Sequence, residues 1–372
     1  MLRERHPRTG AFDGEVTIEF GLETMSLTVL NVAYPFAGVG PNAVGGAEQV
    51  LTALDTALMK GGHRSIVLAS EDSIVAGTHW RMPKEVGTID RHVRSRFWVL
   101  YREAIEEIRR RFNVDLVHLH GIDFHAYCPQ DGATLVTLHL PIAWYPEDSL
   151  RYTRPGLWMN CVSTSQARAA PEGIRLLPPI VNGVDVDALS YRHARRNFAL
   201  FLGRICPEKG VHVAIEAARS AEVPLLIAGK VFPYKAHQQY FEARIEPQLG
   251  SGCRYIGALD FARKRRFLAS AGCLLLPSLA EETSSLVAME AMACGTPVIA
   301  FRRGALSEII SHGRTGFLVE DAAEMAEAIL IADEIDPDLC RSETRARFPS
   351  QAMCAAYLER YRDLALHRAA AE

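Results

Sequence analysis

The sequence lacks the hallmarks of membrane-spanning, secreted and nucleic-acid-binding proteins. No apolar run approaches the roughly 18 residues that cross a membrane, and we find no signal peptide. We therefore expect a cytoplasmic protein whose membrane contact is at most peripheral. The chain has 41 basic and 44 acidic residues, and without a basic excess it is not expected to bind nucleic acid. Two basic runs, 109–111 and 263–266, are typical of solvated helix faces.

The cysteines also lack the spacing of a covalent or metal-bound framework. Eight are present, none forms a CxxC pair, and most lie in apolar strand or helix patterns. Such scattered cysteines are typical of small core residues in a reducing compartment. We therefore expect neither a disulfide framework nor a zinc knuckle.

The length of the chain predicts two domains. With 372 residues, of which 48% are apolar, the chain is too long for one ordinary core. Residues 1–24 are polar and show no periodicity, so we treat them as an extension. The segment around 177–196 contains two prolines and an Asn-Gly turn, which mark a linker or crossover. We place the first domain at 25–180 and the second at 181–348.

Strand and helix patterns alternate through both halves of the chain. Buried strands are expected at 27–36, 64–70, 115–120, 134–139 and 160–164, and then at 198–203, 224–229, 273–278, 296–301 and 315–319. Helical patterns begin near Ala47 and cover 95–111, 211–220 and 349–368. A strand, a glycine loop, a helix and a second strand open a parallel, doubly wound sheet. The fold class is therefore α/β, with two Rossmann-like domains.

The first glycine loop, GVGPNAVGGAEQ, lies where the first strand gives way to the first helix. Gly45 and Gly46 fall at the helix start, where free N–H groups favour a bound anion, so we expect Gly46 to contact phosphate or sugar. A purely structural loop is one alternative. Another is a dinucleotide fingerprint built on Gly38, Gly40 and Ala43, with Glu71 as the ribose acid of a dehydrogenase.

The second domain repeats this arrangement with charge added. Arg204 and Lys209 flank the loop GRICPEKG, which follows a predicted strand and opens a helix. Ligands of doubly wound sheets bind at the carboxyl ends of the strands. Two cations there can hold a diphosphate. The alternative is that both are surface residues paired with Glu208.

The stretch EETSSLVAMEAM follows another predicted strand and contains two glutamates eight residues apart. Glu290 lies in an apolar, buried helix, where a carboxylate needs hydrogen-bonding partners such as a ribose diol. Glu282 precedes the helix and would face the hydroxyls of a sugar. Either Ser284 or Ser285 is expected to cap the helix. The N–H donors expected to face phosphate are those of Ser285, Leu286 and Val287.

Taken together, these motifs resemble the nucleotide-sugar domain of GT-B glycosyltransferases, the retaining family 4. The resemblance is carried by the Glu-x7-Glu stretch with AMACGTPVIA, by GALSEIISHGRTGFLVE, by FLGRICPEKG, by GGAEQ and by the crossover VNGVD. It implies two facing domains with the active site in their cleft, and a helix over 349–368 that packs back onto the first domain. It also implies hexosyl transfer from a nucleoside-diphosphate sugar with retained configuration and without a cofactor or required metal.

The resemblance also implies roles for individual residues. His139 matches the family's histidine near the transferred sugar, and we assign catalysis to His139, Arg204, Lys209 and Glu282. The backbone near Leu259 is expected to read the nucleotide base. Family members commonly have an aromatic residue and a glycine where this chain has two serines, which leaves the sugar specificity open. His118 and His120 share one strand face, and a structural role there is as compatible with the sequence as a functional one.

The resemblance implies the class of the donor but does not identify the acceptor. The acceptor is unidentified and is a sugar, a lipid-linked sugar or a small molecule. Two alternatives keep the same architecture: a nucleotide-sugar epimerase, which would need no acceptor, and a non-catalytic nucleotide-sugar-binding protein.

Overall fold

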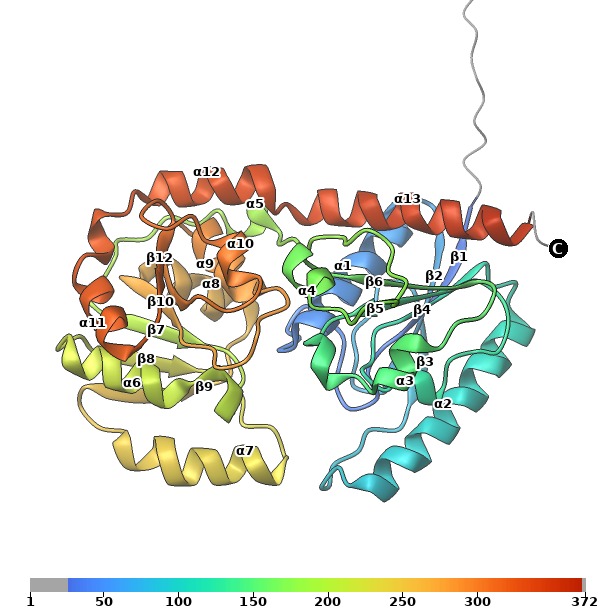
Figure 1. Ribbon diagram of the computed structural model, residues 1–372, viewed down its shortest axis with the longest axis horizontal. Helices are drawn as coiled ribbons and strands as arrows, with labels where there is room; N and C mark the ends of the chain where they lie inside the picture. The colour runs from blue at the N-terminus through green and yellow to red at the C-terminus, as the bar shows by residue number, and fades with distance from the viewer. Residues whose placement is uncertain (1–25, 370–372) are drawn as a thin grey trace, which may run out of the picture.

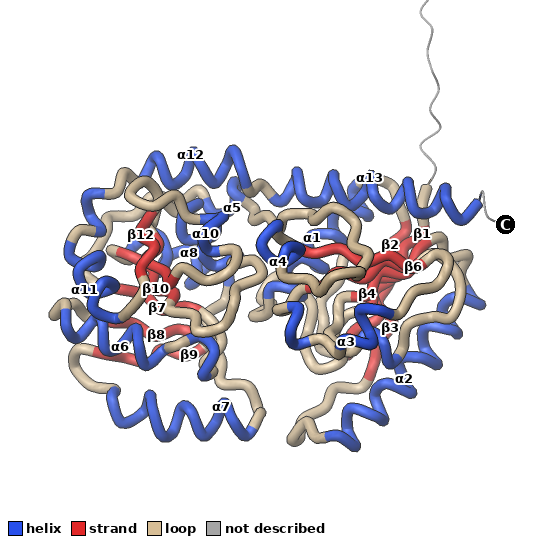
Figure 2. Tube along the Cα trace, in the orientation of Figure 1, coloured by secondary structure: helices blue, strands red, loops and turns tan. Residues whose placement is uncertain are grey.

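The computed structural model describes residues 26–369, and the extension expected at 1–24 lies outside them. The described chain forms two six-stranded, all-parallel sheets with helices packed around each (Figures 1 and 2). None of the helices within 26–369 is long and apolar enough to cross a lipid bilayer.

The first sheet has the strand order β3-β2-β1-β4-β5-β6. Its strands are β1 (Thr28–Val32), β2 (Arg64–Ser70), β3 (Thr78–Met82), β4 (Leu116–Leu119), β5 (Thr134–Leu138) and β6 (Leu157–Cys161). The helices in this half of the chain are α1 (Gly46–Lys60), α2 (Arg91–Arg111), α3 (Glu147–Arg151) and α4 (Thr164–Arg168).

The second sheet has the order β12-β11-β10-β7-β8-β9. Its strands are β7 (Ala199–Leu202), β8 (Leu225–Ala228), β9 (Cys253–Gly257), β10 (Cys273–Leu276), β11 (Val298–Phe301) and β12 (Gly316–Val319). The helices of this half are α5 (Val186–Leu189), α6 (Val211–Ser220), α7 (Lys235–Tyr240), α8 (Phe261–Ser270), α9 (Leu286–Ala293), α10 (Leu306–Ile309), α11 (Ala322–Leu330) and α12 (Pro337–Arg347).

Both sheets follow the same doubly wound order, because each places its first and fourth strands side by side at the centre. The chain reverses direction across the sheet at these central pairs, β1 with β4 and β7 with β10. Loops that leave neighbouring strands at such a switch point diverge and open a crevice for ligands. The predicted α/β fold with two Rossmann-like domains is therefore confirmed.

Two strands were not predicted from the sequence, and both lie at sheet edges. β3 reads THWRM and is largely exposed, and β9 is buried only at Cys253. Edge strands need no continuous apolar run, so the pattern that reveals central strands is missing from them. A third difference concerns β6, which ends three residues earlier than predicted. Ser163 caps α4 there, its hydroxyl accepting from the N–H of Gln166 at 3.2 Å.

The last helix, α13 (Ser350–Ala369), lies along the first sheet although it follows the second one in sequence (Figure 1). The hydroxyl of Tyr361 lies 2.7 Å from Nδ1 of His118 on β4. Where the chain crosses back, Val184 of the first crossover and Pro349 form a parallel bridge. Gly183 has no room for a side chain, since a Cβ there would lie 2.7 Å from the Pro349 oxygen. The two crossovers therefore run side by side.

Candidate functional site

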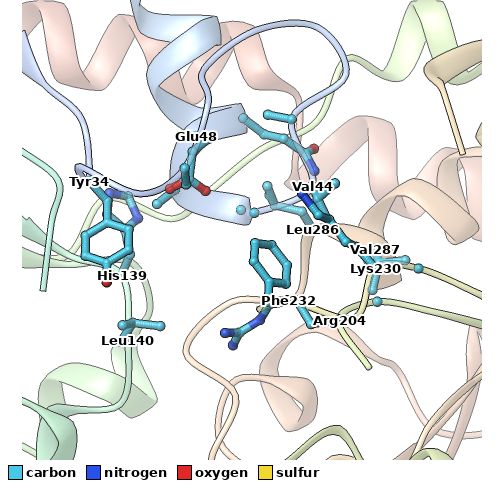
Figure 3. A pocket seen from close by; sticks show the side chains of 18 of the residues that line it. Tyr34, Val44, Glu48, His139, Leu140, Arg204, Lys230, Phe232, Leu286 and Val287 are labelled. Carbon is cyan, nitrogen blue, oxygen red and sulfur yellow. The ribbon is translucent and has the colours of Figure 1, made fainter. Parts of the chain in front are cut away.

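A cavity of about 850 Å³ opens between the loops at the carboxyl ends of both sheets (Figure 3). The structure brings every residue that the sequence nominated for the site to the lining of this one cavity: Gly45, Gly46, His139, Arg204, Lys209, Leu259, Glu282, Ser284, Ser285, Leu286, Val287 and Glu290. Their roles toward a substrate remain predictions, but their contacts define what each can do.

The loops after β7 and β10 pack directly against each other. Gly210 has a left-handed φ of 64°, and a Cβ on it would lie 2.1 Å from the Pro277 oxygen, so a larger residue would force the loops apart. This close approach brings the Lys209 ammonium into an ion pair with the Glu282 carboxylate. The hydroxyl of Ser278 donates to the same carboxylate oxygen. Lys209 and Glu282 thus form a single hydrogen-bonded unit.

The charges of this unit are set by its neighbours. Burial alone would raise the pKa of the Glu282 carboxyl, but Lys209, the Ser278 hydroxyl and the nearby Arg204 together hold that pKa below its usual value. Glu282 is therefore ionised at neutral pH. Within residues 26–369 the Arg204 guanidinium makes no ion pair or hydrogen bond, although it lines the cavity. Arg204 is therefore one of the cavity's cations that are available to a ligand.

Helix α9 begins at the cavity wall. Ser285 occupies the N-cap position, but its side chain accepts no capping bond, and the Ser284 hydroxyl is buried without a partner among the described residues. The predicted serine cap is therefore wrong. Ser285 has a ψ of 89°, outside the extended conformation that lets a capping hydroxyl reach the first turn. The N–H groups of Ser285, Leu286 and Val287 have no acceptor in residues 26–369, and they remain available as donors.

Glu290, one turn into α9, is 5% exposed and pairs with the ammonium of Lys264 on α8. The predicted need for a partner at this buried carboxylate is thus met within the protein. Lys264 belongs to the basic run 263–266, which was predicted to be a solvated helix face. Arg263 is indeed exposed, but the side chain of Lys264 is only 14% exposed, so the prediction is wrong at this position.

The opposite wall comes from the start of α1. Gly45 precedes the helix, and a Cβ there would lie 1.9 Å from a Glu48 carboxylate oxygen, so glycine makes room for that side chain. Gly46 faces α9, and a Cβ on it would lie 3.6 Å from the Leu286 side chain. Glu48 is buried and lines the cavity (Figure 3). Burial raises the pKa of its carboxyl, although the charge of Arg204 opposes that shift.

Sequence reasoning missed Glu48 because an acid in the first turn of a helix is common and needs no ligand to explain it. The available signal was its place beside the apolar stripe of α1, which contains Leu51 and Leu54. A carboxylate on the apolar side of a helix faces the protein interior, so its presence there indicates either a buried partner or a cavity. The dehydrogenase alternative is not supported, because Glu71, the residue it would use to bind the ribose, is exposed and does not line the cavity.

Three histidines form a buried cluster at the cavity wall, where His120 and His139 line the cavity and His118 lies behind them. His118 contacts the hydroxyl of Thr137 at 2.8 Å through Nε2, and its ring centre lies 3.9 Å from that of His120. His120 in turn contacts His139. Burial, with a smaller contribution from the neighbouring histidines, holds the pKa values of His118 and His120 well below their usual range. Burial lowers the pKa of His139 to about 3. All three rings are neutral at pH 7.

This neutrality predicts a loss of stability in acid. The unfolded chain binds a proton at each of these histidines below its ordinary pKa of about 6.5, whereas the folded chain does not. The free energy of unfolding is therefore unaffected by these histidines well above pH 6.5. At pH 5.5 each ring lowers it by about 1.4 kcal/mol. Urea denaturation at pH 7.5 and pH 5.5 measures this difference. An unfolding free energy that stays constant between the two values would contradict the buried, neutral assignment.

The two walls touch each other around the cavity. The Thr283 hydroxyl, just before α9, donates to the backbone oxygen of His139 at 2.8 Å. The N–H of Phe261 on α8 donates to the side-chain oxygen of Asn42 at 3.1 Å. These bonds hold the starts of α9 and α8 in the second domain against the loops that contain His139 and Asn42 in the first domain.

One group of possible metal ligands lies next to the Arg204 loop. Donor atoms of Cys206, Glu208 and His237 fall within 4.8 Å of one another, the one such set found in residues 26–369. Donor atoms that bind one zinc ion at 2.0–2.3 Å lie within about 4 Å of each other. The limit of 4.8 Å that contains this group is wider, so the spacing does not by itself indicate a zinc site. Burial raises the pKa of the Cys206 thiol to about 11, so the thiol stays protonated, and it donates to the backbone oxygen of Arg204 at 3.8 Å. We assign no metal to this group.

Two family models match the chain, one over each half. The model described as Glycosyl transferases group 1 matches residues 196–332, and that described as Glycosyltransferase Family 4 matches residues 44–187. An uncharacterized glycosyltransferase of Methanocaldococcus jannaschii is 34% identical over 141 residues. That alignment covers 38% of each chain, so this chain matches well under two thirds of that relative.

A longer but weaker match extends over most of the chain. The phosphatidyl-myo-inositol mannosyltransferase of Mycolicibacterium smegmatis is 26% identical over 322 residues, covering 77% of this chain and 80% of that protein. Among solved structures, Anabaena HepE in complex with UDP-glucose superposes with a TM-score of 0.70 at 19% identity, covering 91% of this chain and all of that one (100%). The structural likeness shows the fold, and with the two family matches it shows that the chain belongs to the group 1, family 4 glycosyltransferases of the GT-B fold.

Proposed function

We propose that the protein transfers a hexosyl group from a nucleoside-diphosphate sugar to an acceptor hydroxyl, with the anomeric configuration retained. The observation that carries the proposal is the convergence of three elements suited to binding phosphate on one cavity: Arg204, the Lys209–Glu282 unit and the N–H groups at the start of α9. Within residues 26–369, Arg204 has no ion pair and these N–H groups have no acceptor. Together the three elements supply the cations and donors that a departing diphosphate needs.

In the proposed reaction, the bond between the sugar's anomeric carbon and the diphosphate oxygen breaks, and its electron pair leaves with the diphosphate. Arg204, Lys209 and the α9 N–H groups stabilise the negative charge that develops there. The acceptor oxygen bonds to the anomeric carbon on the same face, and its proton passes to a diphosphate oxygen. His139, on the opposite wall, hydrogen-bonds the sugar. Glu282 positions the sugar rather than attacking it, because its carboxylate is already engaged by Lys209 and Ser278.

The proposal includes neither a metal ion nor a cofactor. In this scheme Arg204 and Lys209 provide the charge that a divalent cation provides in other nucleotide-sugar enzymes. The pairing of Lys209 with Glu282 holds the ammonium at the cavity wall before the donor binds, so little reorganisation is needed when it does. We expect activity to persist in the presence of EDTA.

The donor and the acceptor are proposed as classes. The structural neighbour binds UDP-glucose and the mycobacterial relative is a mannosyltransferase, so UDP- and GDP-hexoses are the first donors to test. Leu259 and Ala258, between β9 and α8, line the cavity where the base would lie. The acceptor is a sugar, a lipid-linked sugar or a small molecule. Trp144, which is 39% exposed and lines the first-domain side, offers a stacking surface for it.

The first test is a thermal-shift panel of UDP, GDP, ADP and dTDP with their glucose, mannose and N-acetylglucosamine derivatives, in EDTA. A ligand at 100 times its Kd stabilises the folded state by about 2.7 kcal/mol, which raises the Tm measurably. We expect one base to give a clear shift. Stabilisation by NAD instead, or by no nucleotide at all, would contradict the proposed function.

Turnover then separates the proposal from its alternatives. A glycosyltransferase releases nucleoside diphosphate and forms a glycoside when an acceptor is present, whereas an epimerase converts the sugar without an acceptor. A binding protein shifts the Tm and consumes nothing. Chromatography of the labelled donor with and without candidate acceptors distinguishes these three outcomes.

A further inference from the structure

His139 is held by a second histidine from the neighbouring strand. Nε2 of His139 lies 3.0 Å from Nδ1 of His120, which follows β4. Their ring planes are nearly parallel, inclined by 19°, and the ring centres lie 5.3 Å apart. Both side chains line the cavity, and both are buried, with His120 3% and His139 9% exposed. The contact therefore joins two ring nitrogens of side chains that are largely buried.

The contact decides which nitrogen of His139 can meet a ligand. Nε2 is taken by His120, whereas Nδ1 has no protein partner in residues 26–369 and is not among the enclosed, unpaired atoms. Since His139 lines the cavity, Nδ1 is the nitrogen that opens onto it. The remaining nitrogen of His120, Nε2, is enclosed and has no hydrogen-bond partner among the described residues.

These constraints distinguish the two possible tautomers. If His139 donated from Nε2, the proton of His120 would sit on its own Nε2, as a buried N–H without an acceptor. If His120 donates from Nδ1, its Nε2 is a bare lone pair, and the proton of His139 sits on Nδ1. A buried donor without an acceptor is the rarer and costlier defect. The second arrangement is therefore favoured, and it turns an N–H of His139 toward the cavity.

His120 is itself fixed from behind. The His118 ring centre lies 3.9 Å from that of His120, and His118 is held by the hydroxyls of Thr137 on β5 and Tyr361 on α13. A ring enclosed in this way cannot turn to exchange its two nitrogens. The orientation of His120, and with it the tautomer of His139, is built into the packing of β4, β5 and α13.

We propose that His120 is a positioning residue: its Nδ1–H donates to Nε2 of His139 and thereby fixes His139 as an N–H donor to the transferred sugar. The inference rests on the proposed function, because the sugar is the ligand that His139 would meet. It adds the residue that sets the protonation pattern of His139, which neither the sequence motifs nor the family matches assign.

Three substitutions of His120 separate the hydrogen bond from the space that the ring fills. His120→Leu removes the donor and keeps the volume. In His120→Asn the amide lies near the position of Nδ1, whereas in His120→Gln it lies near that of Nε2. We expect kcat to fall about 100-fold in the Leu and Gln variants, with the donor KM within about threefold of wild type, and to recover to within about tenfold in the Asn variant.

His63→Leu is the matched control. Nδ1 of His63 accepts from the N–H of Leu27 at 3.2 Å, at the end of the first sheet away from the cavity. This variant also loses a buried histidine hydrogen bond, so its stability falls while its kcat stays within about twofold of wild type. A kcat of His120→Leu equal to that of wild type, or equal losses in the Asn and Gln variants, would overturn the proposal.

A spectroscopic measurement tests the tautomer without any turnover. In protein labelled with ¹⁵N-histidine, two-bond couplings to the ring protons identify the nitrogen that carries the proton, and His139→Gln assigns the His139 signals. We expect the proton on Nδ1 in the wild type; a proton on Nε2 would overturn the proposal. Absence of turnover with every donor would instead refute the proposed function, while the couplings still decide the tautomer.

Discussion

Replacing Arg204 by alanine is expected to lower kcat/KM by about 1,000-fold. Its guanidinium lines the cavity without an ion pair in residues 26–369, so a donor diphosphate would be its main electrostatic partner. Removing one preorganised donor to a developing negative charge typically costs a factor of about 100 to 1,000, and the loss of a full positive charge lies at the upper end. Arg204→Lys keeps the charge but loses the bidentate hydrogen-bonding geometry of the guanidinium. We expect kcat/KM to fall by about 100-fold in this variant.

Initial rates of nucleoside-diphosphate release measure this effect. The matched control is Arg302→Ala, which removes an exposed arginine of the same domain, paired with Glu320, and does not touch the cavity. Its rate should stay within about twofold of wild type. Because Arg204 makes no ion pair or hydrogen bond among the described residues, its removal should change the unfolding free energy by less than about 1 kcal/mol. Near-normal turnover of Arg204→Ala in a folded protein would refute the proposed mechanism.

The sequence nominated residues that line one cavity because these residues follow strand ends. Gly46, Arg204 and Glu282 each follow a predicted strand, and parallel strands bring all such positions to one edge of a sheet. Knowing the fold class was therefore enough to place Arg204 and Glu282 at one edge of the second sheet and Gly46 at the corresponding edge of the first. The depth of that cavity, and the position of Leu286 opposite Gly46 across it, depend on how two separate sheets face each other.

The partners of the charged residues were not predictable in the same way. Lys264 and Glu290 lie on different helices, and nothing local in a run of four basic residues distinguishes the one that turns inward. The same holds for His120 and His139, which come together through the register of β4 with β5, where His118 pairs with Leu135. Register is a long-range property set by which faces are buried, and a sequence window does not contain it.

The Glu290–Lys264 pair yields the largest expected effect on stability. With side-chain exposures of 6% and 14%, the pair is almost fully removed from water. Breaking such a pair by removing one partner typically costs about 3–5 kcal/mol, because the other charge is left buried and uncompensated. Lys264→Ala should therefore lower the unfolding free energy by about 3 kcal/mol, as measured by urea denaturation at pH 7.5. Arg345→Ala, which breaks an exposed pair with Asp187, should cost less than about 1 kcal/mol.

The double variant Lys264→Met with Glu290→Leu separates the structural role of the pair from its proposed role in binding ribose. Replacing a buried ion pair by apolar residues of similar volume is often neutral, so we expect stability to recover to within about 1 kcal/mol of wild type. If Glu290 binds the ribose as proposed, affinity for the nucleotide should not recover, because the carboxylate expected to accept from the ribose hydroxyls is gone. A thermal shift with the nucleoside diphosphate equal to that of wild type would show that Glu290 serves the fold alone. Loss of the thermal shift in a stable protein would assign the carboxylate to the nucleotide, with Lys264 as the residue that holds it in place.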